Sequence, residues 1–144
     1  MFDTDRFVAD CQAALHSADP AGRIATVLTE ALRDPRAVAA ALAADADTPG
    51  LVPLFRSDAL TVAHVVSAPH SRSPIHNHCM WGVIGIYAGQ EDNHLYRRGD
   101  GGLHVYGGDL LQRPGRSLWD PDSGAEEPYA FERVLEYTAR LSAA

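Results

Sequence analysis

Apolar residues in the first third of the chain recur at the spacing of amphipathic helices. Within residues 7–15 and 24–32 they lie three or four positions apart, so each run presents one apolar face. Asp19 is placed as an N-cap with Pro20 at the first helical position, and Asp34-Pro35 restarts the pattern. The sequence therefore predicts three short helices within residues 1–47.

The pattern changes after Thr48-Pro49-Gly50 to short runs rich in Val, Leu, Ile and aromatic residues. The runs that predict strands are LVPLFR, LTVAHVVSAP, WGVIGIYAG, NHLYRR and LHVYGGDLL. The turn residues SD and GDGG separate some of them. We therefore expect a compact antiparallel β-region over residues 51–112, in which 60–68 and 81–88 form buried strands.

The last part of the chain predicts a loop and then a helix. Residues 113–128 are dense in turn residues, whereas apolar residues return to helical spacing over 128–141. A chain of 144 residues suits one domain with a single core. The fold class expected for residues 1–144 is mainly β with flanking helices.

Charge and cysteine content narrow the classes of function. The net charge of −7 argues against a nucleic-acid-binding protein, which would normally carry a basic face. Neither a signal peptide nor a run long enough to span a bilayer is recognisable, so no membrane partner is expected. Cys11 and Cys79 lie far apart, which favours reduced thiols. We expect a cytoplasmic protein.

His76 and His78 are the first candidates for a functional site. On a strand, residues i and i+2 project from the same face, so both imidazoles would point together. Two neutral imidazoles can each bind a metal at about 2.1 Å, and imidazole suits Zn, Fe, Cu and Ni. Strand alternation would turn Cys79 away as a small core residue. The alternative interpretation is a chance His-x-His pair on a surface strand.

The segment around this pair resembles the first motif of the cupin superfamily, in IHNH, in the Trp81-Gly82 step and in Gly89. Gly82 and Val83 stand where most cupins place a glutamate ligand. That departure is shared by a branch with three histidine ligands, the cysteine dioxygenase family of thiol dioxygenases. Further segments similar to that family are LFRSDALTV, LHVYGGD and RSLWDPDSGAEEPY, so the likeness runs from about residue 51 to the end.

This resemblance implies a double-stranded β-helix fold and a mononuclear Fe(II) site. His76 and His78 would be iron ligands, His104 and Tyr106 would orient substrate and O2, and Arg56 would bind the substrate carboxylate. The implied reaction is the oxidation of a small thiol, cysteine or 3-mercaptopropionate, to a sulfinate with O2.

The sequence departs from the family between LYRRGDGG and LHVYGGD, which follow one another almost directly. The interval in which the family has its third iron histidine is thus shortened. The third ligand is then His94 or His104, or the site has only two ligands. A shortened barrel must pair its strand edges again, so a homodimer is one expected outcome. The alternative function is a catalytically impaired cupin-like module that binds a metal or small molecule.

Overall fold

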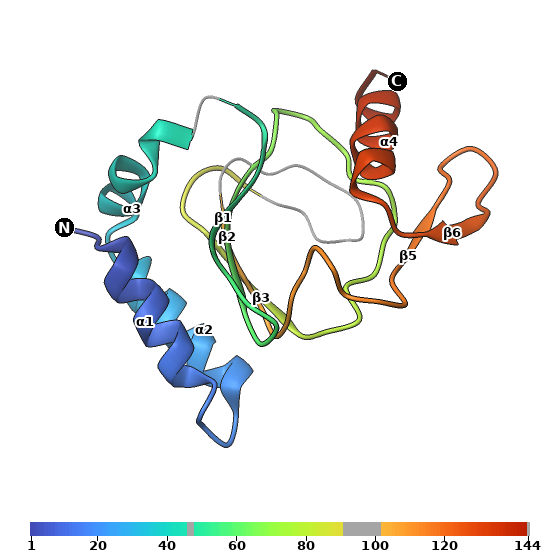
Figure 1. The fold of residues 1–144 in the computed structure, drawn as a ribbon. Helices are drawn as coiled ribbons and strands as arrows, with labels where there is room; N and C mark the ends of the chain where they lie inside the picture. The colour runs from blue at the N-terminus through green and yellow to red at the C-terminus, as the bar shows by residue number, and fades with distance from the viewer. Residues whose placement is uncertain (46–47, 91–101, 144) are drawn as a thin grey trace.

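The computed structural model describes residues 1–45, 48–90 and 102–143 (Figure 1). In chain order the described elements are α1 Thr4–Ala14, α2 Pro20–Ala31, α3 Pro35–Ala41, the 3-10 helix η1 Ala43–Asp45, β1 Gly50–Arg56, β2 Thr61–Val66, β3 Gly82–Ile86, β4 Gly102–Tyr106, β5 Ser117–Trp119, β6 Glu126–Pro128 and α4 Phe131–Ala143. The three predicted N-terminal helices are confirmed. The predicted strand NHLYRR lies outside the described residues.

The N-terminal helices begin at aspartate caps. The side chains of Asp3, Asp19 and Asp34 accept hydrogen bonds of 2.9, 3.0 and 3.0 Å from the main-chain N–H three residues ahead. Pro20 and Pro35 each occupy the first turn, where a missing N–H costs nothing. The predicted Asp19 cap is confirmed, and the same physical reason accounts for the restart at Asp34.

Four strands form an antiparallel sheet in the order β1-β2-β4-β3. Tyr106 of β4 pairs with Thr61 of β2 on one side and with Gly82 of β3 on the other. His104, two residues earlier on β4, pairs in the same way with Ala63 and Ile84. The paired positions share one face of the sheet because side chains alternate along a strand. A mainly antiparallel β-region with flanking helices is therefore confirmed.

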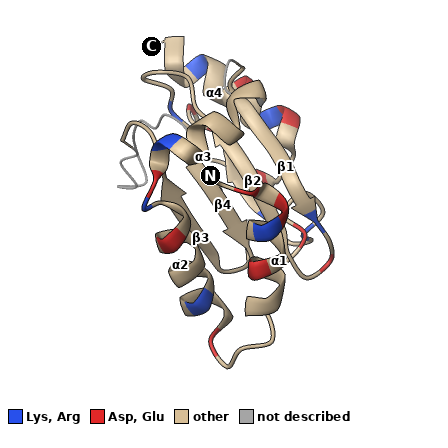
Figure 2. Cartoon of the chain, turned by 90° about the vertical axis from the view of Figure 1, so that its left-hand side faces the viewer, with Lys and Arg blue, Asp and Glu red and all other residues tan. Residues whose placement is uncertain are grey.

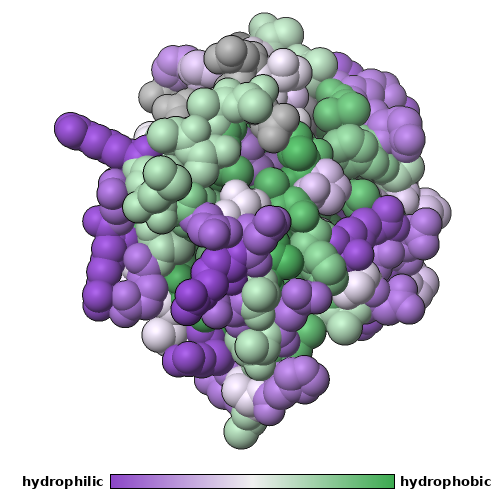
Figure 3. Space-filling view, turned by 60° about the vertical axis from the view of Figure 1, so that its left-hand side comes forward, coloured by the Kyte–Doolittle hydropathy of each residue, from purple (hydrophilic) through white to green (hydrophobic). Residues whose placement is uncertain are grey.

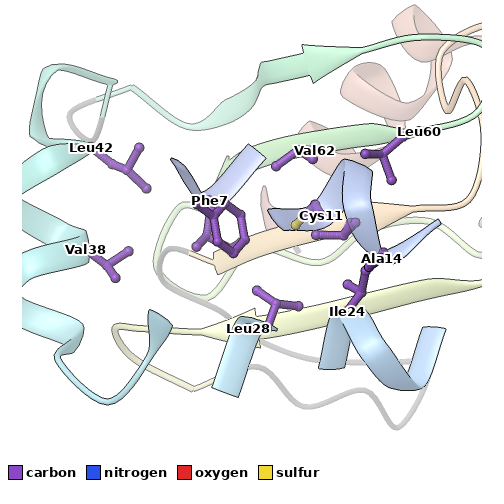
Figure 4. Packing of buried hydrophobic residues seen from close by; sticks show 11 residues of the cluster. Phe7, Cys11, Ala14, Ile24, Leu28, Val38, Leu42, Leu60 and Val62 are labelled. Carbon is purple, nitrogen blue, oxygen red and sulfur yellow. The ribbon is translucent and has the colours of Figure 1, made fainter. Parts of the chain in front are cut away.

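One face of the sheet is covered by the N-terminal helices (Figure 2). The buried core between them is drawn in Figure 4 and includes Phe7 and Cys11 of α1, Ile24 and Leu28 of α2, and Val62, Leu103 and Val105 of the sheet. Burial raises the pKa of the Cys11 thiol to about 12, so this cysteine is an inert core residue. A Cβ at Gly85 would lie 2.7 Å from the Leu32 side chain, so α2 approaches β3 closely because that position is glycine.

Edge position decides how far β3 is buried. Val83, Gly85 and Ile86 are buried or half-buried, whereas Gly82 and Ile84 are exposed. The prediction of a buried strand over 81–88 is therefore wrong in part, because β3 is the last strand of the described sheet. On the face seen in Figure 3, hydrophobic residues reach the surface between hydrophilic ones.

A smaller layer lies on the other side of the sheet from α1 and α2 (Figure 1). It consists of the β5–β6 hairpin, α4, and the segment before His78, which bonds to β5 through Asn77 N–H to Ser117 O at 3.1 Å. The prediction of a loop over 113–128 is thus wrong where β5 and β6 form. The terminal helix begins at Phe131 rather than at residue 128.

On the helical side, acidic and basic residues both occur along the helices (Figure 2). None of the helices within the described residues is long and apolar enough to cross a membrane.

Candidate functional site

His76 and His78 meet although they do not belong to a regular strand. Only His76 forms an isolated bridge, to Leu118 of β5, and the residues that follow it are irregular. The two rings nevertheless project to the same side, with 3.2 Å between their Nε2 atoms and 5.0 Å between their centroids. The predicted convergence of the pair is therefore confirmed, with the bridge to β5 in place of a strand.

Hydrogen bonding fixes the tautomer of His76. Its Nδ1 lies 2.8 Å from the carbonyl oxygen of Pro74, and a carbonyl can only accept, so Nδ1 carries the proton. The Nε2 atom of the neutral ring then has a free lone pair and accepts from Nε2–H of His78. A metal ion placed between the two Nε2 atoms would replace that one proton, with His78 changing to the Nδ1–H tautomer.

The spacing of the two nitrogens suits a shared metal ion. With two bonds of about 2.1 Å, a separation of 3.2 Å between the Nε2 atoms gives an N–metal–N angle of roughly 100°. That angle lies between the ideal values for adjacent ligands in octahedral and tetrahedral sites. The separation of the two nitrogens is therefore compatible with both rings binding one ion from the same side.

Both rings are held in the neutral form that metal binding needs. Burial lowers the pKa of His76, and the Arg116 charge lowers it further, against an opposing effect of the Pro74 carbonyl. The pKa of His78 is lowered to about 4, mainly by burial and then by His76, Arg116 and His104. Little proton competition is therefore expected at neutral pH.

His104 and Tyr106 form the wall of the site on β4. They point to the same face, and His104 Nδ1 lies 2.9 Å from the Tyr106 hydroxyl. The Tyr106 ring stands edge-on to His78, with 4.9 Å between centroids, and a Cβ at Gly82 would lie only 3.0 Å from it. Burial, followed by the effect of His64, lowers the pKa of His104 to about 4. The structure thus brings together four of the five predicted site residues, and their roles stay predictions.

Arg56 lies at the end of β1 and already has a carboxylate partner. Its Nε and Nη2 donate to the two oxygens of Asp109 at 2.7 and 2.8 Å. The hydrogen bond from Arg56 is the main cause that lowers the pKa of Asp109. The predicted binding of a substrate carboxylate by Arg56 stays a prediction, and it would require this ion pair to open.

Arg116, which sequence reasoning did not select, is buried beside the histidines. It is 5% exposed, and its Nε donates to Asn77 O at 2.8 Å, its Nη1 to Leu110 O at 2.6 Å. Within the described part of the chain no carboxylate forms an ion pair with it; instead its Cζ lies 3.5 Å from the centroid of the Tyr129 ring. No pattern in the sequence indicates this position, because Arg116 and Ser117 are both polar and Leu118 and Trp119 both apolar, without the alternation that is typical of a half-buried strand.

Two of the candidate metal ligands, His76 and His78, lie together among the described residues. Over residues 1–45, 48–90 and 102–143 no three His, Cys, Asp or Glu side chains gather as a metal-binding group. His94 lies outside the described residues, and His104 bonds to Tyr106. The prediction that Cys79 is a core residue is wrong, because it has φ 53° and its side chain is exposed.

Comparison with models of known protein families and with curated proteins finds no match to this chain. The resemblance to the cysteine dioxygenase family therefore stays a prediction.

Proposed function

We propose that the chain is a cupin-like, mononuclear metal protein that acts as a thiol dioxygenase of the cysteine dioxygenase type. The observation that supports this most is the convergence of His76 and His78 Nε2 atoms at 3.2 Å, beside the bonded pair His104 and Tyr106. In this proposal the metal is Fe(II), held by His76 and His78, with His94 or His104 as the candidate for a third ligand.

The proposed reaction adds both atoms of O2 to the sulfur of a small thiol and gives a sulfinate. Sulfur is oxidised by four electrons and O2 is reduced by four, so no further reductant is needed. Bound iron would supply the open positions at which thiolate and O2 meet. The Tyr106 hydroxyl, positioned by His104, would donate a hydrogen bond towards them.

A substrate carboxylate needs a cation beside the histidine pair. Arg56 is occupied by Asp109, whereas Arg116 is buried near both histidines and has a π face rather than a carboxylate as its partner. We therefore place the carboxylate of cysteine or 3-mercaptopropionate at Arg116, with Arg56 as the alternative. A guanidinium is well suited to bind a carboxylate with two hydrogen bonds.

The second candidate function is a module that binds a metal or small molecule without turnover. It is favoured by the two-ligand count among the described residues, because iron sites of this class use three protein ligands. A homodimer is compatible with either function and stays a prediction.

Metal analysis together with oxygen uptake tests the two functions. Purified protein is reconstituted with Fe(II), and oxygen consumption is followed with cysteine and with 3-mercaptopropionate. The enzyme predicts near-stoichiometric iron and turnover that is lost in His76→Ala but kept in His16→Ala, a change at an exposed histidine outside the site. Iron binding without turnover supports the metal-binding module, and protein that neither binds iron nor consumes oxygen contradicts both the enzyme and the iron-binding form of the module.

A further inference from the structure

Tyr129 is joined to Arg116 by two independent contacts. Its main-chain N–H donates to Arg116 O at 3.0 Å, and its ring lies under the guanidinium at 3.5 Å from Cζ. The same ring lies 6.1 Å from the His76 ring, measured between centroids. Tyr129 therefore lies against the histidine pair, between the end of β6 and the start of α4.

Arg116 in turn holds the main chain of the pair. Its Nε donates to the carbonyl of Asn77, the residue between His76 and His78, and its Nη1 fixes Leu110 O. Because the segment after His76 has no strand ladder of its own, these bonds and those of Asn77 to Ser117 determine where its carbonyl and rings lie. A shift of the guanidinium would therefore move the two imidazoles relative to each other.

An aromatic face holds a buried cation differently from a carboxylate. A cation–π contact attracts the guanidinium and fixes the plane in which it lies, yet it leaves the full positive charge in place. A protein carboxylate in place of the ring would cancel that charge and occupy the donors that a substrate carboxylate needs. Tyr129 thus orients Arg116 while its Nε and Nη1 donate to the main chain, and it leaves the Nη2 donors to the substrate carboxylate of the proposed function.

We propose that Tyr129 is a positioning residue for the histidine pair, acting through Arg116 by its aromatic face rather than by its hydroxyl. This inference rests on the proposed role of His76 and His78 as metal ligands. Partners behind metal ligands commonly change metal affinity by 10- to 100-fold when they are lost. We expect a loss of about tenfold when the ring is removed.

The test compares Tyr129→Leu, which removes the ring, with Tyr129→Phe, which keeps it. Cobalt(II) chloride is titrated into each protein and binding is followed by visible absorption. Tyr129→Leu should raise the dissociation constant about tenfold, whereas Tyr129→Phe should restore wild-type binding. Tyr87→Leu is the matched control, because Tyr87 bonds to His64 at 2.7 Å and its ring packs against the core cluster that includes α1 and α2.

A measurement on metal-free protein separates this inference from the proposed function. Nitrogen-15 NMR should show the Asn77 amide and the imidazole signals of His76 and His78 shifted in Tyr129→Leu but not in Tyr129→Phe or Tyr87→Leu. If Tyr129→Leu does not fold, Tyr129→Met, which fills much of the same volume without a π face, replaces it. Absence of cobalt binding in the wild type would refute the metal site alone; unshifted signals in the ring-free variant, or equal shifts in Tyr129→Phe, would overturn the positioning role.

Discussion

Nε2 of His76 lies 3.2 Å from Nε2 of His78, while the Nδ1–H group of His76 donates a hydrogen bond to the carbonyl oxygen of Pro74. Both rings are therefore set to share one proton in the metal-free protein. The functional proposal puts one metal ion in place of that proton, with each Nε2 lone pair facing the ion. This relationship is the basis of the functional proposal.

Acid should destabilise the fold through the neutral buried histidines. The pKa of His104 is about 4 in the folded protein and about 6.5 when unfolded, so between these values the unfolded state binds more protons. Stability is then present above pH 6.5 and is lost as the pH falls towards 4, by up to about 3 kcal/mol for this residue. His78, with its pKa lowered to about 4, adds to the loss in the same direction.

Urea unfolding of metal-free protein at pH 7.0, 5.5 and 4.5 measures this loss. In His104→Gln the decline over that range should be smaller than in the wild type, because one of the groups that takes up a proton on unfolding is gone. An equal decline in both proteins would show that His104 does not carry the effect.

The close approach of α2 to the sheet predicts a strict requirement for glycine at position 85. A methyl group in Gly85→Ala would lie 2.7 Å from one Leu32 side-chain carbon and 3.1 Å from one Leu28 side-chain carbon, so these side chains must repack. We expect a loss of about 1–3 kcal/mol in the free energy of unfolding, typical of an overpacked core. Gly50→Ala is the control, because nothing lies within 4 Å of its added methyl group. Equal stability of the two variants would disprove the packing argument.

Kinetics can decide which arginine binds the substrate carboxylate. If Arg116 binds it, Arg116→Lys should raise KM for the thiol at least tenfold, because lysine cannot reproduce the planar guanidinium. Arg56→Lys should change KM much less, since its side chain bonds to Asp109. Oxygen uptake at varied thiol concentration gives both values, and the reverse order would assign the carboxylate to Arg56.

The elements with strong local signals could be predicted from the sequence. The capped helices and the strands β1, β2, β3 and β4 lie where periodicity and turn residues place them. β5 and β6 could not be predicted, because each has three residues and exists only through pairing with its neighbour. For the same reason the burial of Arg116, which depends on that hairpin, was not foreseen.

The site shows the same division between local and long-range information. The i, i+2 spacing predicted correctly that His104 and Tyr106 share a face of β4, and that His76 and His78 converge, although the latter pair is not on a regular strand. Alternation failed one residue later, at Cys79, because its left-handed backbone conformation interrupts the extended segment. The partner of Arg56 could not be inferred, because Asp109 lies 53 residues away in the sequence.

X-ray absorption spectroscopy of the protein loaded with one equivalent of zinc shows whether His76 and His78 bind a metal ion together. We expect at least two imidazole nitrogens at about 2.1 Å from the metal, and one fewer in His76→Ala. A first shell of oxygen atoms alone, or the same number of imidazoles in the wild type and in His76→Ala, would contradict it.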